Sequence, residues 1–294
     1  MKIFFVINPR SGTEKNTILD SLISAKAEEL KFEFEIYFIE GNDCENVIRK
    51  KIEQIQPDIV AAAGGDGTVN ILAGILAYTN ITLLIIPMGS ANGMARELQI
   101  GNSPELALSL LKTGITQSID LIKINGKVCI HLADVGLNAR IVKRFEQEKK
   151  RGMFSYARHL LAEVFLLKHY RFLIKYENKV IKRKAVSLTF ANASRYGTGA
   201  VINPHGKLND GFFELIIVKP FPDIKIFSIA WKMFRNKLHT SDYVEVISCR
   251  EARLRCSRKT TLQVDGEIIG RVKEFHIEMM HHALKVLVPD TYSG

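Results

Sequence analysis

Three short loops rich in glycine and hydroxyl side chains have the composition of a phosphate-binding site. The stretch Gly64-Gly65-Asp66-Gly67-Thr68 follows an apolar run at 58–63 and precedes a helical pattern. Glycines at such a point let the backbone approach an anion, and the start of the following helix adds its dipole. Asp66 would repel a bare phosphate, so it indicates a divalent metal or a reacting hydroxyl between them. The stretch predicts a phosphate-plus-metal loop, with a tight strand-to-helix turn as the alternative.

Two further loops of similar composition follow predicted strands. Asn8-Pro9-Arg10-Ser11-Gly12 ends the apolar run 2–8, and residues 87–93 follow the apolar run 81–87. Either loop alone is compatible with an ordinary turn. The carboxyl ends of parallel strands share one edge of a sheet, where α/β proteins bind ligands. Together with residues 64–68 the two loops therefore predict a nucleotide cleft, although no lysine follows the glycines as in a Walker loop.

The spacing of apolar residues predicts the elements that position these loops. In the first 120 residues, strand-like runs at 2–8, 32–39, 58–63 and 81–87 alternate with helical stripes. The stripe Ile48, Ile52 and Ile55 is an example of helical spacing. Strands separated by helices indicate a doubly wound parallel sheet.

After about residue 120 the pattern changes to antiparallel β structure. Asn125-Gly126 separates two strand-like runs and is a strong hairpin signal. Strand-like segments follow at 172–176, 185–192, 212–218, 243–249, 252–257 and 261–267. We expect an N-terminal α/β nucleotide-binding domain over 1–125 and a mainly antiparallel β sandwich or barrel domain over 126–282. The last strand, within 283–294, can return to the first domain. Helices are expected along a stripe at 153–165 and around 222–238.

The positive charge of the chain is concentrated in one segment. The 294 residues carry a formal charge of +10, and residues 140–184 contain 14 Lys or Arg against four Glu. A solvated helix face is one interpretation. The alternative is attraction to anionic lipid, with candidate side chains Lys143, Arg144, Lys149, Lys150, Arg151 and Arg158. No nucleic-acid recognition motif accompanies them.

Composition also bears on location. The four cysteines lack metal-type spacing, no signal peptide is recognisable, and no apolar run reaches the roughly 18 residues of a membrane span. We therefore expect a cytoplasmic protein with reduced thiols and peripheral membrane association. A homo-oligomer is compatible with the sequence.

The loop sequences resemble the nucleotide-binding blocks of the diacylglycerol kinase catalytic-domain family, lipid kinases that include the sphingosine and ceramide kinases. Three matching segments are nucleotide-binding blocks: Asn8-Pro9-x-Ser11-Gly12, Gly64-Gly65-Asp66-Gly67-Thr68-x-Asn70 and Pro87-x-Gly89-Ser90-x-Asn92. A second-domain block consists of Asn192, Gly197, Gly199, Pro204 and Leu208-Asn209-Asp210-Gly211. The last block is Val264-Asp265-Gly266-Glu267. NAD kinases and phosphofructokinases share the Gly-Gly-Asp-Gly-Thr block. The last two blocks therefore narrow the resemblance to the lipid kinase family.

The resemblance implies a donor, a metal and the residues that bind them. It implies ATP, Mg²⁺ and a lipid hydroxyl such as that of diacylglycerol, in phospholipid biosynthesis. The implied nucleotide-binding residues are Asn8, Pro9, Ser11, Gly12, Gly64, Gly65, Asp66, Gly67, Thr68, Asn70, Gly89, Ser90 and Asn92. A structural Mg²⁺ is implied at the carboxylate of Asp210, with the backbone carbonyls of Lys207 and Phe212.

The resemblance also implies that Asp265 is the catalytic base. A lipid alcohol is a poor nucleophile, so phosphoryl transfer needs a carboxylate that accepts its proton. Glu267 would support the metal or Asp265. An Asp-Gly pair at a strand end is also compatible with a plain hairpin turn. In the sphingosine kinases the residue matching Asp66 has the base role, so Asp66 is the alternative base.

The chain departs from the family pattern at Gly93, where many members carry an aspartate of the metal network. Our main hypothesis is an ATP-dependent lipid kinase. A NAD kinase-like or other small-alcohol kinase is one alternative. The other, suggested by Gly93, is an ATP-binding membrane regulator with weak catalysis. The sequence leaves the identity of the lipid open.

Overall fold

The fold consists of two compact units, which we describe separately. The computed structural model describes residues 1–11, 13–41, 43–136, 169–194, 201–204, 206–225, 228–229, 231–232 and 235–292. The first unit comprises residues 1–120 and 282–294, and the second comprises residues 121–281. Within the described ranges, no helix is long and apolar enough to cross a membrane.

The first unit is built on a parallel sheet with the strand order β4-β3-β1-β2. The strands are β1 (Lys2–Ile7), β2 (Glu33–Phe38), β3 (Ile59–Gly64) and β4 (Thr82–Pro87). All of β3 and β4 is buried, as expected for parallel strands covered on both faces. The end of the long strand β14 (Glu267–Val288) pairs with β4 in parallel, so the end of the chain belongs to this sheet.

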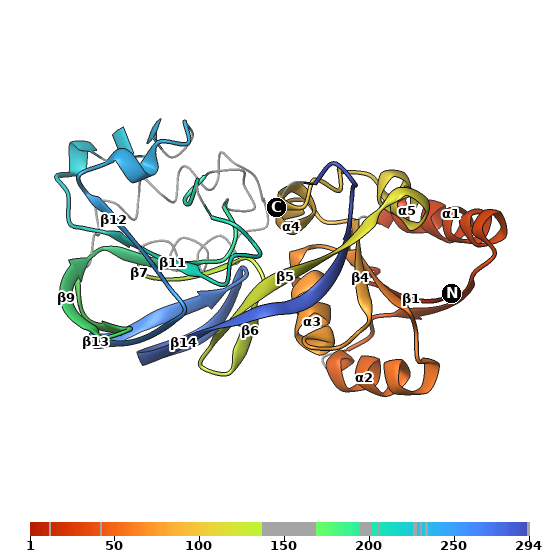
Figure 1. The fold of residues 1–294 in the computed structure, drawn as a ribbon, viewed down its shortest axis with the longest axis horizontal. Helices are drawn as coiled ribbons and strands as arrows, with labels where there is room; N and C mark the ends of the chain where they lie inside the picture. Colours follow the sequence, from red (N-terminus) through yellow and green to blue (C-terminus); the bar gives the residue numbers. More distant parts are fainter. Residues whose placement is uncertain are drawn as a thin grey trace. The chain divides into compact units, whose positions relative to one another are not determined.

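Helices cover both faces of this sheet, which confirms the predicted doubly wound architecture. They are α1 (Thr13–Leu30), α2 (Cys44–Ile55), α3 (Asp66–Leu76), α4 (Gly93–Glu97) and α5 (Pro104–Thr113). Helices α1 and α5 contact each other on one face, and α2 and α3 contact each other on the other face (Figure 1). The stripe Ile48, Ile52 and Ile55 is buried, as its spacing predicts. The sequence analysis missed α4 and α5.

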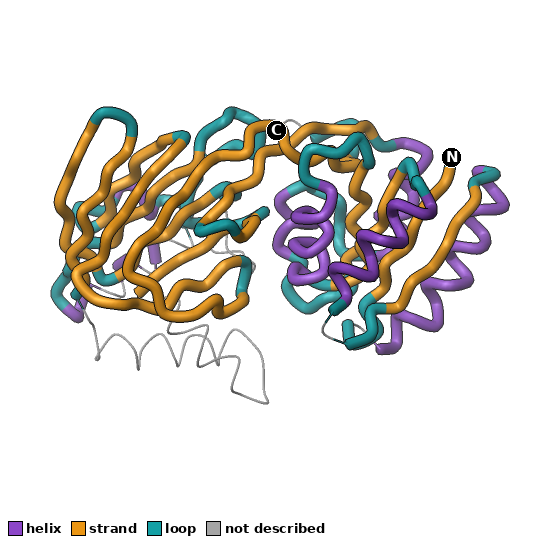
Figure 2. The backbone as a smooth tube through the Cα atoms, turned by 90° about the horizontal axis from the view of Figure 1, so that it is seen from below, coloured by secondary structure: helices purple, strands orange, loops and turns teal. Residues whose placement is uncertain are grey.

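The strands of the second unit pair in antiparallel fashion, as expected for the C-terminal half. Figure 2 shows that strands make up most of this unit. Its strands are β6 (Lys127–Cys129), β7 (Leu132–Gly136), β8 (Tyr170–Tyr176), β9 (Lys179–Ala185), β10 (Ser187–Ala191), β11 (Phe213–Val218), β12 (Val244–Cys249) and β13 (Glu251–Val264). The unit also contains residues 121–124 of β5 (Ile115–Ile124) and residues 267–281 of β14. The order is β12-β11-β10-β7-β13-β14, and β8 and β9 extend from β13.

Of three expectations for this half, one needs correction, one agrees with the described residues, and one lies outside them. The segments 252–257 and 261–267 are not separate strands, because both belong to β13, which ends at Val264 with an irregular register between Arg255 and Thr260. Within 222–238 the described residues include a 3₁₀ turn at Asp223–Lys225 and α-helical residues at 228–229 and 231–232, which agrees with the helix expected there. The stripe at 153–165 and its basic neighbours lie outside the described residues.

The predicted hairpin at Asn125-Gly126 is confirmed. Ile124 pairs with Lys127, and the two turn residues have φ values of 49° and 85°, which asparagine and glycine tolerate best. The Asn125 side chain also accepts a hydrogen bond from the His276 N–H at 2.8 Å and donates one to the Glu274 carbonyl at 3.0 Å. The asparagine therefore both permits the turn and fixes it to β14.

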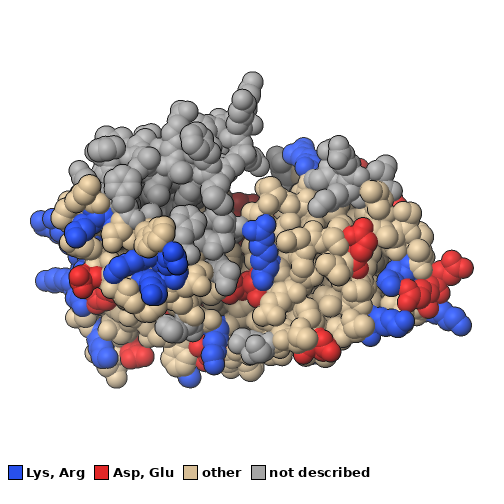
Figure 3. Space-filling model, turned by 90° about the horizontal axis from the view of Figure 1, so that it is seen from above, with Lys and Arg blue, Asp and Glu red and all other residues tan. Residues whose placement is uncertain are grey.

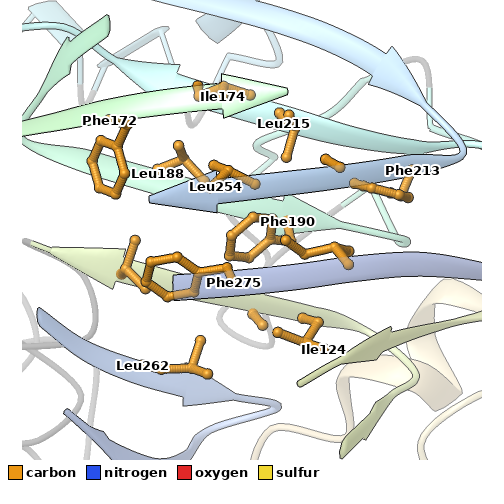
Figure 4. Packing of buried hydrophobic residues seen from close by; sticks show 14 of the residues in the cluster. Ile124, Phe172, Ile174, Leu188, Phe190, Phe213, Leu215, Leu254, Leu262 and Phe275 are labelled. Atoms are coloured by element: carbon orange, nitrogen blue, oxygen red, sulfur yellow. The ribbon is translucent and has the colours of Figure 1, made fainter. Parts of the chain in front are cut away.

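Aromatic and aliphatic side chains from many strands form the core of the second unit (Figure 4). Phe190 of β10 and Phe275 of β14 are both buried, with ring centroids 6.0 Å apart. Phe172 of β8 adds a third ring, 6.5 Å from that of Phe275. These contacts join strands that are distant in the sequence.

Replacing Phe190 by alanine should lower the free energy of unfolding by about 3–5 kcal/mol, because a fully buried ring is removed and a cavity remains. Urea unfolding followed by circular dichroism measures the change. The exposed Val180 is the matched control, and Val180→Ala should change stability by less than about 0.5 kcal/mol. Equal effects of the two variants would contradict this description of the core.

Candidate functional site

The two glycine loops of the first unit meet backbone to backbone at the carboxyl edge of the sheet. Gly65 follows β3, and Gly89 follows β4. A Cβ placed on Gly89 would lie 2.7 Å from the Cα of Gly65, closer than real Cβ atoms approach other heavy atoms. A side chain at Gly64 would collide with the Thr68 side chain. Glycine is therefore required at position 89 by the close packing of one loop on the other, and at position 64 by the Thr68 side chain of its own loop.

The loop after β1 joins this pair. The Asn8 N–H donates to the Ala63 carbonyl at 2.8 Å, and its side-chain amide lies 3.4 Å from the Thr68 hydroxyl. The Asn8 carboxamide oxygen accepts from the Arg10 N–H at 3.1 Å, which shapes the loop towards Ser11. The first two loops thus share hydrogen bonds at Thr68. Gly12 lies outside the described residues.

Asp66 connects the second loop to the third. It is the first residue of α3, and its carboxylate accepts a hydrogen bond from the Met94 N–H at 3.2 Å. That bond satisfies an N–H in the first turn of α4, which begins at the buried Gly93. Asp66 is the one carboxylate in the three loop sequences. Any cation held with phosphates at these loops would depend on it.

Asn92 closes the third loop into a turn. Its carboxamide accepts from the Gly89 N–H and donates to the Gly89 carbonyl, both at 2.8 Å. Asn92 has φ of 51°, in the left-handed region that asparagine tolerates. The predicted residues Gly89 and Asn92 are thus brought together, and the exposed Ser90 lies between them.

These loops fit the phosphates of a nucleotide. The Asn70 carboxamide oxygen is buried and has no hydrogen-bond partner within the described ranges, which leaves an acceptor for a ligand or its water. Gly65 carries no side chain that would block the start of α3. The N–H groups of Thr68 and Val69 donate to the Gly65 carbonyl, whereas those of Asp66 and Gly67 have no helical partner among the described residues. Such N–H groups, with the helix dipole, favour an anion.

Asp265 of the second unit lies at the tip of the β13–β14 hairpin. Val264 pairs with Glu267, and Asp265 and Gly266 form the turn with φ values of 46° and 90°. The Asp265 N–H donates to the Leu132 carbonyl at 3.0 Å. The Asp-Gly pair is therefore a hairpin turn, and it is also fixed to a distant segment.

Four donors from residues 129–132 hold the Asp265 carboxylate. Oδ1 accepts from the backbone N–H groups of His131 and Leu132, both at 3.0 Å, and from the Cys129 thiol at 3.4 Å. Among the residues that the structure describes, Oδ2 accepts from the Ile130 N–H alone, at 2.9 Å. A carboxylate oxygen has about two acceptor sites, so Oδ2 has one more available.

Burial shifts the pKa values of the Asp265 carboxyl and of the Cys129 thiol that donates to it. It raises the pKa of the Asp265 carboxyl above its usual value, and the neighbouring His131 and the backbone N–H groups act against that rise. Burial and the charge of Asp265 raise the pKa of the Cys129 thiol well above its usual value. Cys129 therefore stays protonated as a donor, and Asp265 becomes a stronger proton acceptor.

The segment before β11 contains the predicted metal residues. Asp210 is exposed, and one of its carboxylate oxygens accepts from the Phe212 N–H at 2.9 Å. Gly211, with φ of 77°, allows the turn between them. The second Asp210 oxygen has no hydrogen-bond partner within the described part of the chain. Hard cations prefer such carboxylate and carbonyl oxygens. The exposed residues Lys207 and Asp210 flank the buried Leu208 in the same segment.

A buried carboxylate that the sequence analysis missed lies beside this segment. Glu214 on β11 is 9% exposed, accepts from the Asn203 amide at 2.5 Å, and accepts from the Ser248 hydroxyl at 3.2 Å. Burial raises the pKa of Glu214 to about 6, and the charge of Asp210 acts in the same direction. A glutamate on the inward face of an apolar strand was the available signal.

His131 was also missed, because a single histidine in an apolar run is uninformative. It is 6% exposed, and its Nε2 atom is buried without a hydrogen-bond partner within the described ranges. Glu267, the other predicted catalytic residue, is the first residue of β14 and is exposed.

The two units match two family models. Residues 2–124 match the diacylglycerol kinase catalytic domain. Residues 132–288 match the YegS C-terminal NAD kinase beta sandwich-like domain, which supports a sandwich for the second unit.

Similar proteins span nearly the whole chain. A diacylglycerol kinase of Staphylococcus saprophyticus is 27% identical over 97% of this chain and 94% of its own length. A "Probable lipid kinase YegS-like" protein of Citrobacter koseri is 26% identical over 95% and 93%. A crystal structure of a diacylglycerol kinase from Bacillus anthracis has a TM-score of 0.76 at 17% identity, and a second from that organism has 0.81 at 20%. Each covers 99% of this chain and 98% of its own chain, so the fold is shared.

The raised pKa of Glu214 predicts a pH-dependent contribution to stability. The folded state binds the proton more tightly, so the contribution is fully present below pH 4.5 and is lost as the pH rises through about 6. Relative to Glu214→Gln, the wild type should lose about 2 kcal/mol of unfolding free energy over this window. Urea titrations at several pH values measure the difference.

Ser248→Ala provides the paired test. The Ser248 hydroxyl lowers the pKa of Glu214, so its removal should move the same window to higher pH. A difference between wild type and Glu214→Gln that does not change with pH would show that Glu214 is not buried in this way.

Proposed function

Because this chain belongs to the diacylglycerol kinase catalytic-domain family, we propose that it is an ATP-dependent lipid kinase that transfers the γ-phosphoryl group to a lipid hydroxyl. The observation that carries the proposal is the close approach of Gly65 and Gly89 at the carboxyl edge of a parallel sheet. A cradle of this kind presents backbone N–H groups rather than side chains, which suits a triphosphate.

The first unit binds the donor in this proposal. The N–H groups at the start of α3 and the Thr68 hydroxyl contact the phosphates, and the carboxamides of Asn8, Asn70 and Asn92 maintain the loops or bind the nucleotide. Mg²⁺, when bound with ATP, neutralises phosphate charge as phosphoryl transfer requires. Asp66 would hold that cation, and Asp210 with the carbonyls of Lys207 and Phe212 would hold a structural one.

The second unit activates the acceptor in this proposal. The remaining acceptor site on Oδ2 of Asp265 takes the proton of the lipid hydroxyl. At the same time the hydroxyl oxygen of the lipid forms a bond to the γ-phosphorus of ATP. The bond between that phosphorus and the bridging oxygen breaks, and ADP leaves. The four donors on the carboxylate prevent it from rotating, which keeps Oδ2 oriented.

A lipid acceptor is favoured by the full-length similarity to lipid kinases. The match includes the second unit, which contains the proposed base Asp265, and the relatives are named as diacylglycerol or lipid kinases. Diacylglycerol is the lipid that these names suggest. The acceptor is dissolved in a bilayer, so the protein would act at the cytoplasmic membrane surface as a peripheral enzyme.

Asp265→Asn should lower kcat for phosphate transfer to diacylglycerol by at least about 100-fold, because the proton acceptor is lost. The dissociation constant for ATP should stay within about threefold of wild type, since the phosphate loops belong to the other unit. Labelled ATP with mixed detergent–lipid micelles measures transfer, and calorimetry measures ATP binding.

Asp66→Asn is the comparison that decides between the two candidate bases. If Asp66→Asn abolishes transfer while Asp265→Asn turns over like wild type, the base role belongs to Asp66. Cys129→Ser retains a donor to the Asp265 carboxylate and should keep most activity. It therefore controls for disturbance of the 129–132 segment.

Gly65→Ala should weaken ATP binding at least about tenfold with only a small change in stability. Its φ of −92° suits alanine, and the added Cβ would be 3.5 Å from the nearest protein atom, an ordinary contact. Only a bound phosphate would collide with the methyl group. Calorimetry with ATP and thermal unfolding measure both effects.

Gly41→Ala is the matched control with the opposite signature. Gly41 has φ of 70° and open space around it, so alanine there should cost about 1 kcal/mol of stability without changing ATP affinity. Unchanged ATP binding by Gly65→Ala would disprove the phosphate cradle.

A further inference from the structure

One face of the second unit carries an unusual density of positive charge on adjacent strands. Strand β8 and residues 251–256 of β13 place buried residues on one side and more exposed residues on the other, and β9 is mainly exposed, with Ala185 buried. The buried residues of these segments belong to the core. We call six of the exposed cations on these strands the cationic face. They are Arg171, Lys175, Lys182, Lys184, Arg253 and Arg255.

The cationic face contains like charges directly opposite one another. Arg171 pairs with Lys184 across β8 and β9, and Lys175 pairs with Arg253 across β8 and β13. Directly opposed residues in antiparallel strands point to the same side of the sheet, and like charges at such positions destabilise it. Two such pairs on neighbouring strands oppose folding, and a bound anion would relieve their repulsion.

Carboxylates neutralise only part of the cationic face. Arg253 lies 3.2 Å from Glu251, and Arg255 lies 3.4 Å from Glu274. The other four cations have no ion pair within 4 Å among the described residues. Figure 3 shows one face of the molecule, on which Lys and Arg side chains gather over the second unit.

The same residues line two open grooves. One groove, of 610 Å³, includes Lys175, Arg253 and Arg255, and the other, of 500 Å³, includes Arg171, Lys182 and Lys184. Arg255 lines both grooves, so the positive charge is continuous from one to the other. Each groove is large enough for a phosphate-sized group.

We propose that the cationic face docks the protein on a bilayer that contains anionic phospholipids, with lipid phosphates in the two grooves. The inference rests on the proposed function, since a kinase with a bilayer-dissolved acceptor must meet a membrane surface. Charge complementarity identifies the occupant, because anionic lipids attract clustered Lys and Arg near the surface. The apolar Val180, which is 61% exposed opposite Lys175, suits contact with a bilayer interface.

The composition of the face distinguishes a membrane from a nucleic acid. Proteins that bind single-stranded nucleic acid place aromatic side chains where bases can stack. The exposed residues of β8, β9 and β13 include no aromatic side chain. A nucleic acid is therefore an outcome to be tested rather than the partner we assign.

The test uses the full chain with Arg171, Lys182 and Lys184 all changed to glutamine. These three cations have no ion pair to lose within the described residues, and removal of the Arg171–Lys184 repulsion should keep or raise thermal stability. Co-sedimentation with vesicles of phosphatidylcholine and about 30% phosphatidylglycerol measures binding without ATP. Each cation contributes about fivefold in affinity, so at least a tenfold loss is expected.

The matched control changes three exposed lysines on other elements, Lys50, Lys225 and Lys237, to glutamine. It removes the same charge and should bind within about threefold of wild type. Wild-type binding should also fall sharply in 0.5 M salt, which shortens the screening length to about 4 Å.

Three results would overturn the inference. They are wild-type-like vesicle binding by the Arg171/Lys182/Lys184 variant, an equal loss in the control, or wild-type binding to an oligonucleotide but not to vesicles. The proposed function is tested separately with lipid in nonionic micelles, where the variant should phosphorylate like wild type. A wild type that binds vesicles through this face but transfers no phosphate would disprove the kinase and leave the docking face intact.

Discussion

The arrangement of the first unit depends on the contact between two backbones at Gly65 and Gly89. Any side chain at Gly89 would push the loop after β4 away from the loop after β3. Asp66 and Asn92 use that proximity, one to cap α4 and the other to close the third loop. Loss of the contact would separate the N–H groups that make this edge suitable for an anion.

A different kind of constraint operates in the second unit. The Asp265 carboxylate collects donors from residues 129–132, so a charged group holds the tip of the β13–β14 hairpin against a segment far away in the sequence. Burial would make this carboxylate costly if the donors were absent. Three of the donors bind Oδ1 and one binds Oδ2, so Oδ2 keeps an acceptor site for the proposed substrate hydroxyl. Structural anchoring and orientation of a proton acceptor therefore come from one set of hydrogen bonds.

Electrostatics is distributed unevenly in the second unit. Near Asp210 and Glu214 the carboxylates accumulate, and burial keeps one of them partly protonated at mild pH. On the cationic face, Arg171 and Lys184 oppose each other without a carboxylate between them. Both arrangements weaken the folded state, and both lie on strands whose buried side is well packed. The apolar core provides the stability that such charge clusters reduce.

The sequence by itself determined the features that depend on neighbouring residues. Alternating strands and helices predicted the doubly wound sheet, Asn125-Gly126 predicted its hairpin, and the glycine loops were located at the correct strand ends, because backbone preferences and periodicity are local. Only the tertiary structure decided that Gly65 packs on Gly89, that Asp265 is held by residues 129–132, and that β13 is one strand. These depend on packing and hydrogen bonds between distant segments, which no local pattern encodes.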